Sequence, residues 1–255
     1  MVSNRTGRWR AALAVFAGTA CVAGAIVWSN SGHAEPAGES KCPTTAAATF
    51  GWGAPVRSSD FDSPADLNNW WLYNGPGHAG NGRRTPTAIS GSDGYLTIFG
   101  DAEGNSGGVA LKGPGQVFGR WEVCVKSLPS APGYHSVLLL WPDAENWPVG
   151  GEIDFMEIPD PTRQTAEGWL HFGIDDQRQG TTIPIDATQW HSWAVEWAPE
   201  RIAFFVDGVQ WWETRDTAHF PPGPMHLCMQ LDNFGGDIAA GGRQRIDWAR
   251  EYTLR

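Results

Sequence analysis

The chain has few basic residues, few cysteines and no long helical pattern, and each shortage narrows what the protein can be. Its 255 residues include 18 lysines and arginines against 28 aspartates and glutamates, a formal net charge of −10 at pH 7. An acidic chain binds nucleic acid and anionic membranes poorly, so we expect neither as a partner. A neutral polymer fits this charge better. The four cysteines lack the spacing of metal ligands, so they predict no metal site.

The N-terminal segment differs from the rest of the chain. A basic start with three arginines precedes an apolar run over residues 11–28, and small residues stand three and one before a cut after Ala34. This pattern predicts a secretory signal peptide over residues 1–34. The apolar run is also near the length of a membrane span, so an uncleaved anchor is the alternative. No later segment of the sequence is expected to span a membrane. We therefore expect a secreted protein, extracellular or cell-wall associated, with no membrane contact after cleavage.

The exported part keeps an odd number of cysteines. Removal of three arginines lowers its net charge from −10 to −13, and it retains Cys42, Cys124 and Cys228. Disulfides persist in oxidising compartments, so two of the three can form a bridge. The sequence does not choose the pair.

The domain organisation follows from composition and turn signals. Residues 35–57 are rich in small and polar residues and predict a linker or disordered lead-in. Residues 58–255 alternate short apolar runs with turns, and 32 glycines and 18 prolines punctuate the chain. The predicted strands cover residues 95–99, 109–112, 118–126, 136–141, 151–158, 168–172, 190–197, 202–206, 225–231 and 245–252. Asp207-Gly208 predicts a tight hairpin turn. The fold class is therefore all-β, a jelly-roll-like sandwich of two antiparallel sheets.

Fifteen tryptophans are the chain's second unusual feature. Most must pack in the core, and we expect this of Trp193 and Trp197, which share a face of one strand. Sugars present flat C–H faces that stack on aromatic rings. An acidic, tryptophan-rich, exported β-protein is therefore consistent with polysaccharide recognition.

Three carboxylates interrupt one apolar strand. Glu152 and Asp154 are two residues apart and share a face, whereas Glu157 should point the other way. An extra residue accommodated as a β-bulge between Phe155 and Glu157 would return the third carboxylate to the same face, and bulges are enriched beside active sites. The two glutamate carboxyls would then lie about 5 Å apart, the separation of a retaining glycosidase.

The three carboxylates fit a solvated strand face or a calcium loop less well. A solvated face is disfavoured because Ile153, Phe155, Met156 and Ile158 are apolar. A Ca²⁺ loop would need a run of oxygen ligands with a central glycine, which this segment does not have.

The motif WPVGGEIDFME over residues 147–157 resembles the catalytic strand of glycoside hydrolase family 16 in its bulged E-x-D-x-x-E form. Similar likeness is found in GRWEV (119–123), in WHSWAVEWAPERIAFFVDG (190–208) and over residues 246–252, so the resemblance covers residues 58–255. It implies a concanavalin-like jelly roll whose concave sheet holds an extended β-glycan that is cleaved with net retention.

The resemblance implies a role for each matching residue. Glu152 matches the nucleophile, Asp154 the assisting carboxylate and Glu157 the general acid/base. The matching substrate-binding residues are Trp147, His171, Asn81 and Gln230. Their alternatives are a loop-packing tryptophan, a buried strand histidine and ordinary turn or strand polar residues.

The chain also departs from the family pattern. The segment YHSVL over residues 134–138 replaces the usual Trp-Pro-Ala, aliphatic, Trp, which bears on substrate choice. Asp60 and Asp247 lie near positions where some members hold structural Ca²⁺, but we interpret them as surface carboxylates. No cofactor is expected to be required.

The bulged form resembles β-1,3-glucanases, agarases and related galactan-cleaving members more than the unbulged lichenases and plant transglycosylases. Among these, the chain is similar to bacterial endo-β-1,3-glucanases, or laminarinases, and β-1,3-glucan is the leading expected substrate. We expect a monomer. The alternative function is a non-catalytic, lectin-like glycan-binding module on the same fold, whose signature would be the loss of a carboxylate.

Overall fold

The structure is a computed structural model that describes residues 40–92 and 94–254. The predicted signal peptide lies outside the described residues. One α-helix is found among them, α1 (Ala46–Phe50), with four 3-10 helices, η1 (Pro64–Asn69), η2 (His78–Gly80), η3 (Pro86–Ala88) and η4 (Thr217–His219). None of these described helices is long and apolar enough to cross a membrane.

Strands make up most of the fold. They are β1 (Arg57–Ser59), β2 (Trp70–Leu72), β3 (Gly75–Pro76), β4 (Arg83–Arg84), β5 (Ile89–Ser92), β6 (Tyr95–Gly100), β7 (Asn105–Leu111), β8 (Gly119–Leu128), β9 (Tyr134–Pro142), β10 (Glu152–Ile158), β11 (Thr165–Phe172), β12 (Gln177–Pro184), β13 (His191–Ala198), β14 (Arg201–Val206), β15 (Val209–Thr214), β16 (Met225–Asn233) and β17 (Gly242–Tyr252). Each of the ten predicted runs overlaps one of them. The predicted all-β class is confirmed.

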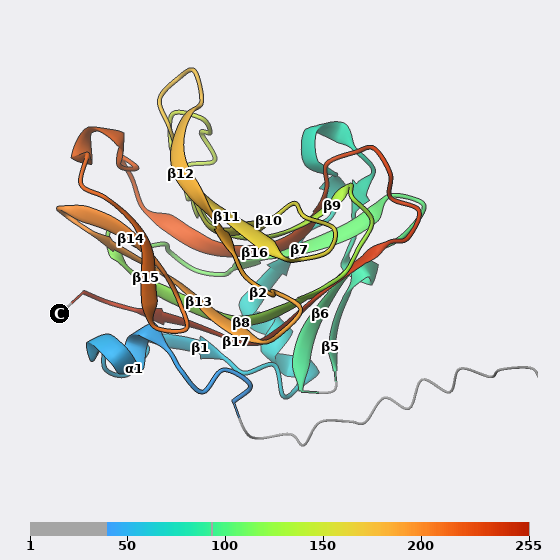
Figure 1. Ribbon diagram of the computed structural model, residues 1–255, viewed down its shortest axis with the longest axis horizontal. Helices are drawn as coiled ribbons and strands as arrows, with labels where there is room; N and C mark the ends of the chain where they lie inside the picture. The colour runs from blue at the N-terminus through green and yellow to red at the C-terminus, as the bar shows by residue number, and fades with distance from the viewer. Residues whose placement is uncertain (1–39, 93, 255) are drawn as a thin grey trace, which may run out of the picture. The chain divides into compact units, whose positions relative to one another are not determined.

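The strands form two stacked sheets. An eight-stranded sheet has the order β15-β14-β13-β8-β17-β6-β5, with β1 paired to β17. A nine-stranded sheet has the order β12-β11-β10-β9-β16-β7-β4-β3, with β2 paired to β7. Figure 1 shows the curved nine-stranded sheet above the other, with loops rising at both of its ends. Pairing is antiparallel except between β4 and β7, so the predicted sandwich of antiparallel sheets is confirmed apart from one short parallel pair.

The core lies between the sheets, and alternation within strands places its side chains there. Trp193, Val195 and Trp197 are fully buried on one face of β13, as predicted for the two tryptophans. The β14–β15 hairpin turns at Asp207 and Gly208, where both φ angles are positive (49° and 73°). That backbone is typical of a type I′ turn, so the predicted turn is confirmed.

The prediction of a disordered lead-in is wrong for residues 40–57. Ala46 and Trp52 are buried against the outer face of the eight-stranded sheet, together with Ala194, Phe205 and Tyr252. Figure 1 shows α1 beneath that sheet. The segment looked like a linker because its residues are small, but small residues let the chain lie close to a sheet whose outer face is apolar.

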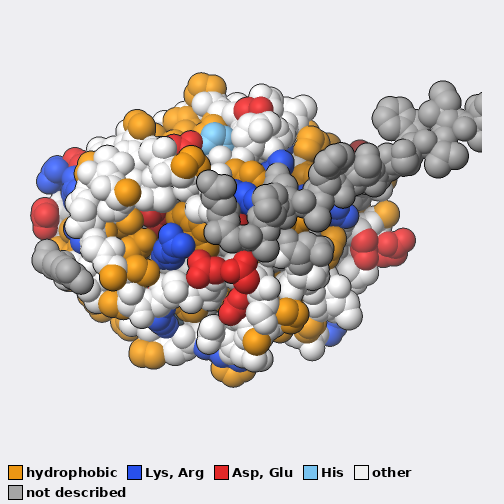
Figure 2. Space-filling view, turned by 90° about the horizontal axis from the view of Figure 1, so that it is seen from below, with side chains coloured by type: hydrophobic (Ala, Val, Ile, Leu, Met, Phe, Trp, Pro, Cys, Tyr) orange, Lys and Arg blue, Asp and Glu red, His pale blue; other side chains and the backbone are white. Residues whose placement is uncertain are grey.

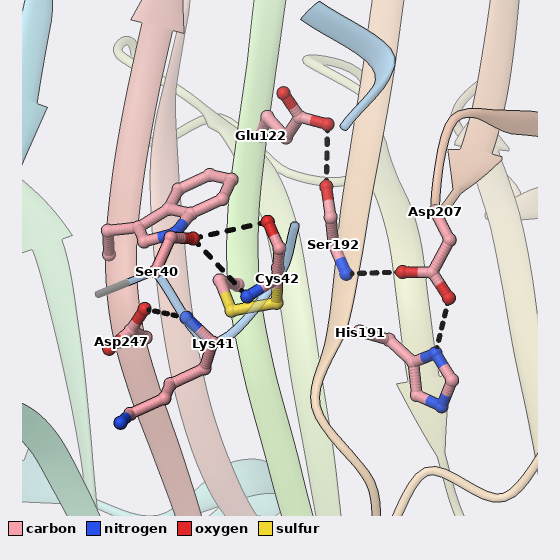
Figure 3. Close-up of a disulfide and its surroundings, with 10 residues drawn as sticks. Ser40, Lys41, Cys42, Glu122, His191, Ser192, Asp207 and Asp247 are labelled. Carbon is pink, nitrogen blue, oxygen red and sulfur yellow. Dashed lines mark hydrogen bonds and ion pairs between the residues drawn. A yellow bond between two sulfur atoms is a disulfide. The ribbon is translucent and has the colours of Figure 1, made fainter. Parts of the chain in front are cut away.

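A disulfide fastens this N-terminal segment. Cys42 bonds to Cys124 of β8 with Cα atoms 5.9 Å apart, and Cys228 stays a buried free thiol. Beside the disulfide, Trp248 donates its indole N–H to Ser40 Oγ (2.9 Å), and Glu122 accepts from the first amide of α1. Figure 3 shows Glu122 also accepting from the hydroxyl of Ser192 (2.6 Å). The sequence left open which two of the three cysteines pair. Cys42 and Cys124 pair because they meet on the outer face of the eight-stranded sheet.

Acidic side chains gather near the middle of the molecule's lower face (Figure 2). Asp247 accepts a bond from the backbone N–H of Lys41 (2.9 Å), and Asp60 pairs with Arg250 (3.2 Å). Both aspartates named in the sequence as near a calcium position therefore have protein donors. Asp60 is exposed, but Asp247 is only 8% exposed, so its interpretation as a surface carboxylate is wrong. A structural Ca²⁺ there stays an untested alternative.

Candidate active site

A β-bulge in β10 gathers the three carboxylates. Asp154 pairs with Leu139 of β9 and Glu157 with Val137, and the register shifts between Asp154 and Met156. Leu139 and Val137 are two residues apart on β9, so they and their partners point to one face. Glu157 is thereby returned to the face of Asp154. A bulge is therefore confirmed, but on the β9 side it falls between Asp154 and Met156, one residue before the predicted place.

The residues at the bulge show its effect on packing. Phe155 and Met156 are consecutive in sequence, yet both are fully buried in the core between the sheets. A regular strand would have sent one of them to the opposite face. The extra residue thus keeps the apolar side chains inside and the carboxylates outside.

Asp154 lies in a chain of charged contacts that leads to a loop. Its Oδ2 is 3.2 Å from His171 Nε2 on the neighbouring strand β11, and His171 Nδ1 is 2.7 Å from Asp176 Oδ1. Glu152 stands directly opposite His171 in the β10–β11 register. One ligand atom each of Glu152, Asp154 and His171 lies within 4.8 Å of the others.

Burial dominates the electrostatics of this cluster. It raises the pKa of Glu152 well above its ordinary value, and the neighbouring Asp154 and Glu157 raise it further. Burial also raises the pKa of Asp154, although His171 opposes the rise. Burial disfavours the charged form of His171, but Asp154 and Asp176 outweigh it and raise the pKa to about 9. At neutral pH, the imidazole therefore carries a positive charge among carboxylates that titrate together.

Glu157 has a different partner. Its Oε1 is 3.0 Å from Nδ1 of His135 on β9. The two glutamates therefore occupy unlike surroundings on one face, Glu152 beside another carboxylate and Glu157 beside an imidazole. Such a difference is what a pair of catalytic carboxyls with separate roles requires.

A groove of about 660 Å³ opens beside Glu152 on this face. The residues that line it are Tyr73, Asn74, Gly75, Pro76, Gly77, His78, Ala79, Arg84, Ala110, Leu139, Trp141, Glu145, Trp147, Glu152, His226 and Gln230. Its floor includes the apolar side chains of Ala110 and Leu139, against which Tyr73 and Trp141 pack. An apolar floor with polar and aromatic walls suits a ligand with flat C–H faces and many hydroxyls.

The predicted substrate-binding residues fall in three places. Trp147 and Gln230 line the groove together with Glu152, and Trp147 is 42% exposed and stacks on Trp141 with ring planes 12° apart. His171 contacts Asp154 instead. Asn81 packs beside Gly235 in the loops next to the groove and does not line it.

Several site residues were not found from the sequence. Asp176 and His135 contact the carboxylate cluster. Tyr73, in the link between β2 and β3, and Arg84 of β4 line the groove. His135 had a signal in the sequence, since it stands where the family pattern has proline. The others had none, because their proximity depends on pairing between strands far apart in the chain.

A metal ion is a weak candidate for the cluster. Glu152, Asp154 and His171 form the one group of metal-type ligands found within residues 40–92 and 94–254. Both nitrogens of His171 already face carboxylates, whereas a ligand histidine needs one nitrogen for the metal. We assign no metal to the site.

A concave β-sheet with carboxylates converging beside an aromatic-walled groove is the arrangement of a glycoside hydrolase. Residues 89–250 match the family described as glycosyl hydrolases family 16, and the chain belongs to that family. The match confirms the resemblance seen in the sequence motifs.

Relatives agree with this assignment. A beta-glucanase of Rhodothermus marinus is 32% identical over an alignment of 151 residues that covers 51% of this chain and 51% of the relative. The chain spans about half or less of the length of the curated relatives it matches. A laminarinase structure from R. marinus is 23% identical with a TM-score of 0.69, covering 78% of this chain and 96% of that one. The laminarinase catalytic domain of Thermotoga maritima is 22% identical with a TM-score of 0.68, covering 79% of this chain and 98% of that one. Such structural likeness shows a shared fold.

Proposed function

We propose that this protein is a secreted, retaining endo-glycosidase that hydrolyses β-linked polysaccharide, with β-1,3-glucan as its leading substrate. The observation that carries the proposal is the bulge that brings Glu157 to the face of Asp154, beside the groove that Glu152 lines. The name of the R. marinus relative, a beta-glucanase, supports the substrate class. Export rests on the predicted signal peptide, and no cofactor is required in this reaction.

The reaction is a double displacement. The carboxylate of Glu152 attacks the anomeric carbon while Glu157 gives its proton to the departing glycosidic oxygen, so that the C–O bond breaks and a glycosyl ester forms. Glu157, now ionised, then takes a proton from a water that attacks the same carbon. The ester bond breaks, Glu152 is released as carboxylate, and the sugar keeps its β configuration.

Asp154 supports the nucleophile. Its Oδ2 faces the charged His171. Its buried Oδ1 has no hydrogen-bond partner in the described part of the chain. A carboxylate in this position stabilises a proton on Glu152, and burial acts in the same direction. The nucleophile must lose this proton before it attacks. We therefore expect the acid limb of activity to lie well above the pKa of an ordinary glutamate.

Replacement of the nucleophile tests the assignment. Glu152→Gln should abolish hydrolysis but leave folding and glycan binding intact, because glutamine preserves shape and cannot attack. Glu200→Gln, in the exposed turn between β13 and β14, is the matched control and should retain full rate. A Glu152→Gln protein that keeps more than a few per cent of the wild-type rate contradicts the assignment.

Two assays test the activity itself. Release of reducing ends should be measured on laminarin, mixed-linkage glucan, agarose and galactan, and we expect laminarin to be cleaved best. Activity on none of them would favour the alternative of a lectin-like glycan-binding module. Proton NMR of the first product should show the β-anomer, and an α-anomer appearing first would contradict retention.

A further inference from the structure

Three aromatic rings stack in a row that ends at Glu157. The ring of His135 lies 3.9 Å from that of Phe234, with planes 14° apart. The other neighbour of Phe234 is His78, at 4.0 Å and 21°. His135 comes from β9, Phe234 follows β16, and His78 belongs to η2, so three separate parts of the chain build the stack.

His135 is the member of this stack that reaches the reacting groups. Its Nδ1 lies 3.0 Å from Glu157 Oε1, and the side chains of the two residues are only 16% and 15% exposed. His135 is two residues from Val137, the partner of Glu157, so it shares the face of the carboxylates. A hydrogen bond so shielded from water holds its geometry better than one on an open surface.

The stack limits how the imidazole can turn. Rings packed in parallel at about 4 Å resist rotation out of plane, because rotation would drive one edge into the neighbouring ring. The ring plane of His135 is therefore set by Phe234, which His78 supports in turn. The remaining freedom of the imidazole is small, and Nδ1 stays directed at Glu157.

We propose that His135 is a positioning residue for the general acid/base Glu157, held in place by the Phe234 and His78 rings. This inference rests on the proposed function. Glu157 has several rotatable bonds, and its proton must reach the glycosidic oxygen at hydrogen-bond distance. A neutral imidazole nitrogen can donate to an ionised carboxylate or, in the other tautomer, accept from a protonated one. His135 can thus hold Glu157 through both of its protonation states.

The place of His135 in the sequence makes this role particular to this chain. The family pattern has proline at that position, and a proline side chain offers no hydrogen bond. Nothing about the strand itself demands a histidine, since β9 pairs with β10 and β16 through its backbone.

Leaving groups of different basicity separate positioning from a general structural role. Two aryl β-laminaribiosides should be compared. One carries a phenyl leaving group, which needs a proton, and the other carries a dinitrophenyl leaving group, which departs without one. His135→Phe keeps a ring for the stack and removes the bond to Glu157. We expect kcat/KM to fall about 10-fold to 100-fold on the phenyl substrate and less than about threefold on the dinitrophenyl substrate.

A second variant keeps the test decisive if the first folds poorly. His135→Asn retains an N–H group at the δ position, and we expect it to recover part of the phenyl activity relative to His135→Phe. Equal losses on both substrates would show a structural role, and no loss on either would remove His135 from the mechanism. Wild-type protein inactive on every glycan and aryl glycoside would instead overturn the proposed function, and this inference with it.

Discussion

Reduction of the Cys42–Cys124 disulfide should weaken the fold considerably. The bond joins residues 82 apart in sequence, and cross-linking a loop of that length removes conformational entropy from the unfolded chain. The loop-closure relation gives about 4.5 kcal/mol at 25 °C for 82 residues. For a domain of this size, that change in the free energy of unfolding corresponds to a fall of roughly 9–18 °C in Tm.

Denaturant unfolding with and without a thiol reductant measures this contribution. Cys42→Ala should match the reduced wild-type protein and show no further response to reductant. Cys228→Ala should keep the full response, because Cys228 is a free thiol on the other sheet. A response below about 1 kcal/mol in the wild type would refute the entropic reasoning. A response that disappears in Cys228→Ala would refute the pairing.

Three further changes test the site and its support. Asp154→Asn should lower the pKa of Glu152, so the acid limb of kcat/KM should move to lower pH even though the rate falls; a limb that stays or moves up would contradict the electrostatic argument. Trp147→Ala removes an exposed ring stacked on Trp141, and KM should rise about threefold to tenfold with kcat nearly unchanged; a fall in kcat alone would exclude a binding role. Arg163→Met removes the guanidinium that donates to four backbone carbonyls, of which those of Ile158 and Tyr134 are buried, and chemical denaturation should show a loss of at least about 3 kcal/mol; a neutral result would mean that water replaces the guanidinium.

The strands that the sequence predicted share one property. Runs such as β8, β10 and β13 are long and rich in apolar or β-branched residues, so local pattern alone reveals them. The strands that were missed are short, as in β3 and β4, or polar, as in β12. They extend because neighbouring strands supply their hydrogen bonds, and no local signal records that.

The active site divides in the same way. The odd spacing between Asp154 and Glu157 required a bulge, because apolar side chains on both sides had to remain buried. The partners of these carboxylates could not be found so directly. His171 could be identified only from the family pattern. Asp176 could not be identified at all, because it lies in a loop without a recognisable motif.

What the sequence by itself determined was local: the all-β class, the turn at Asp207-Gly208 and the bulge that gathers the carboxylates. Each follows from sterics and from side-chain alternation within a few residues. The tertiary structure decided the Cys42–Cys124 pairing, the packing of residues 40–57 and the contact of His135 with Glu157. Those depend on segments far apart in the chain, which meet only when the two sheets form and bury their shared faces.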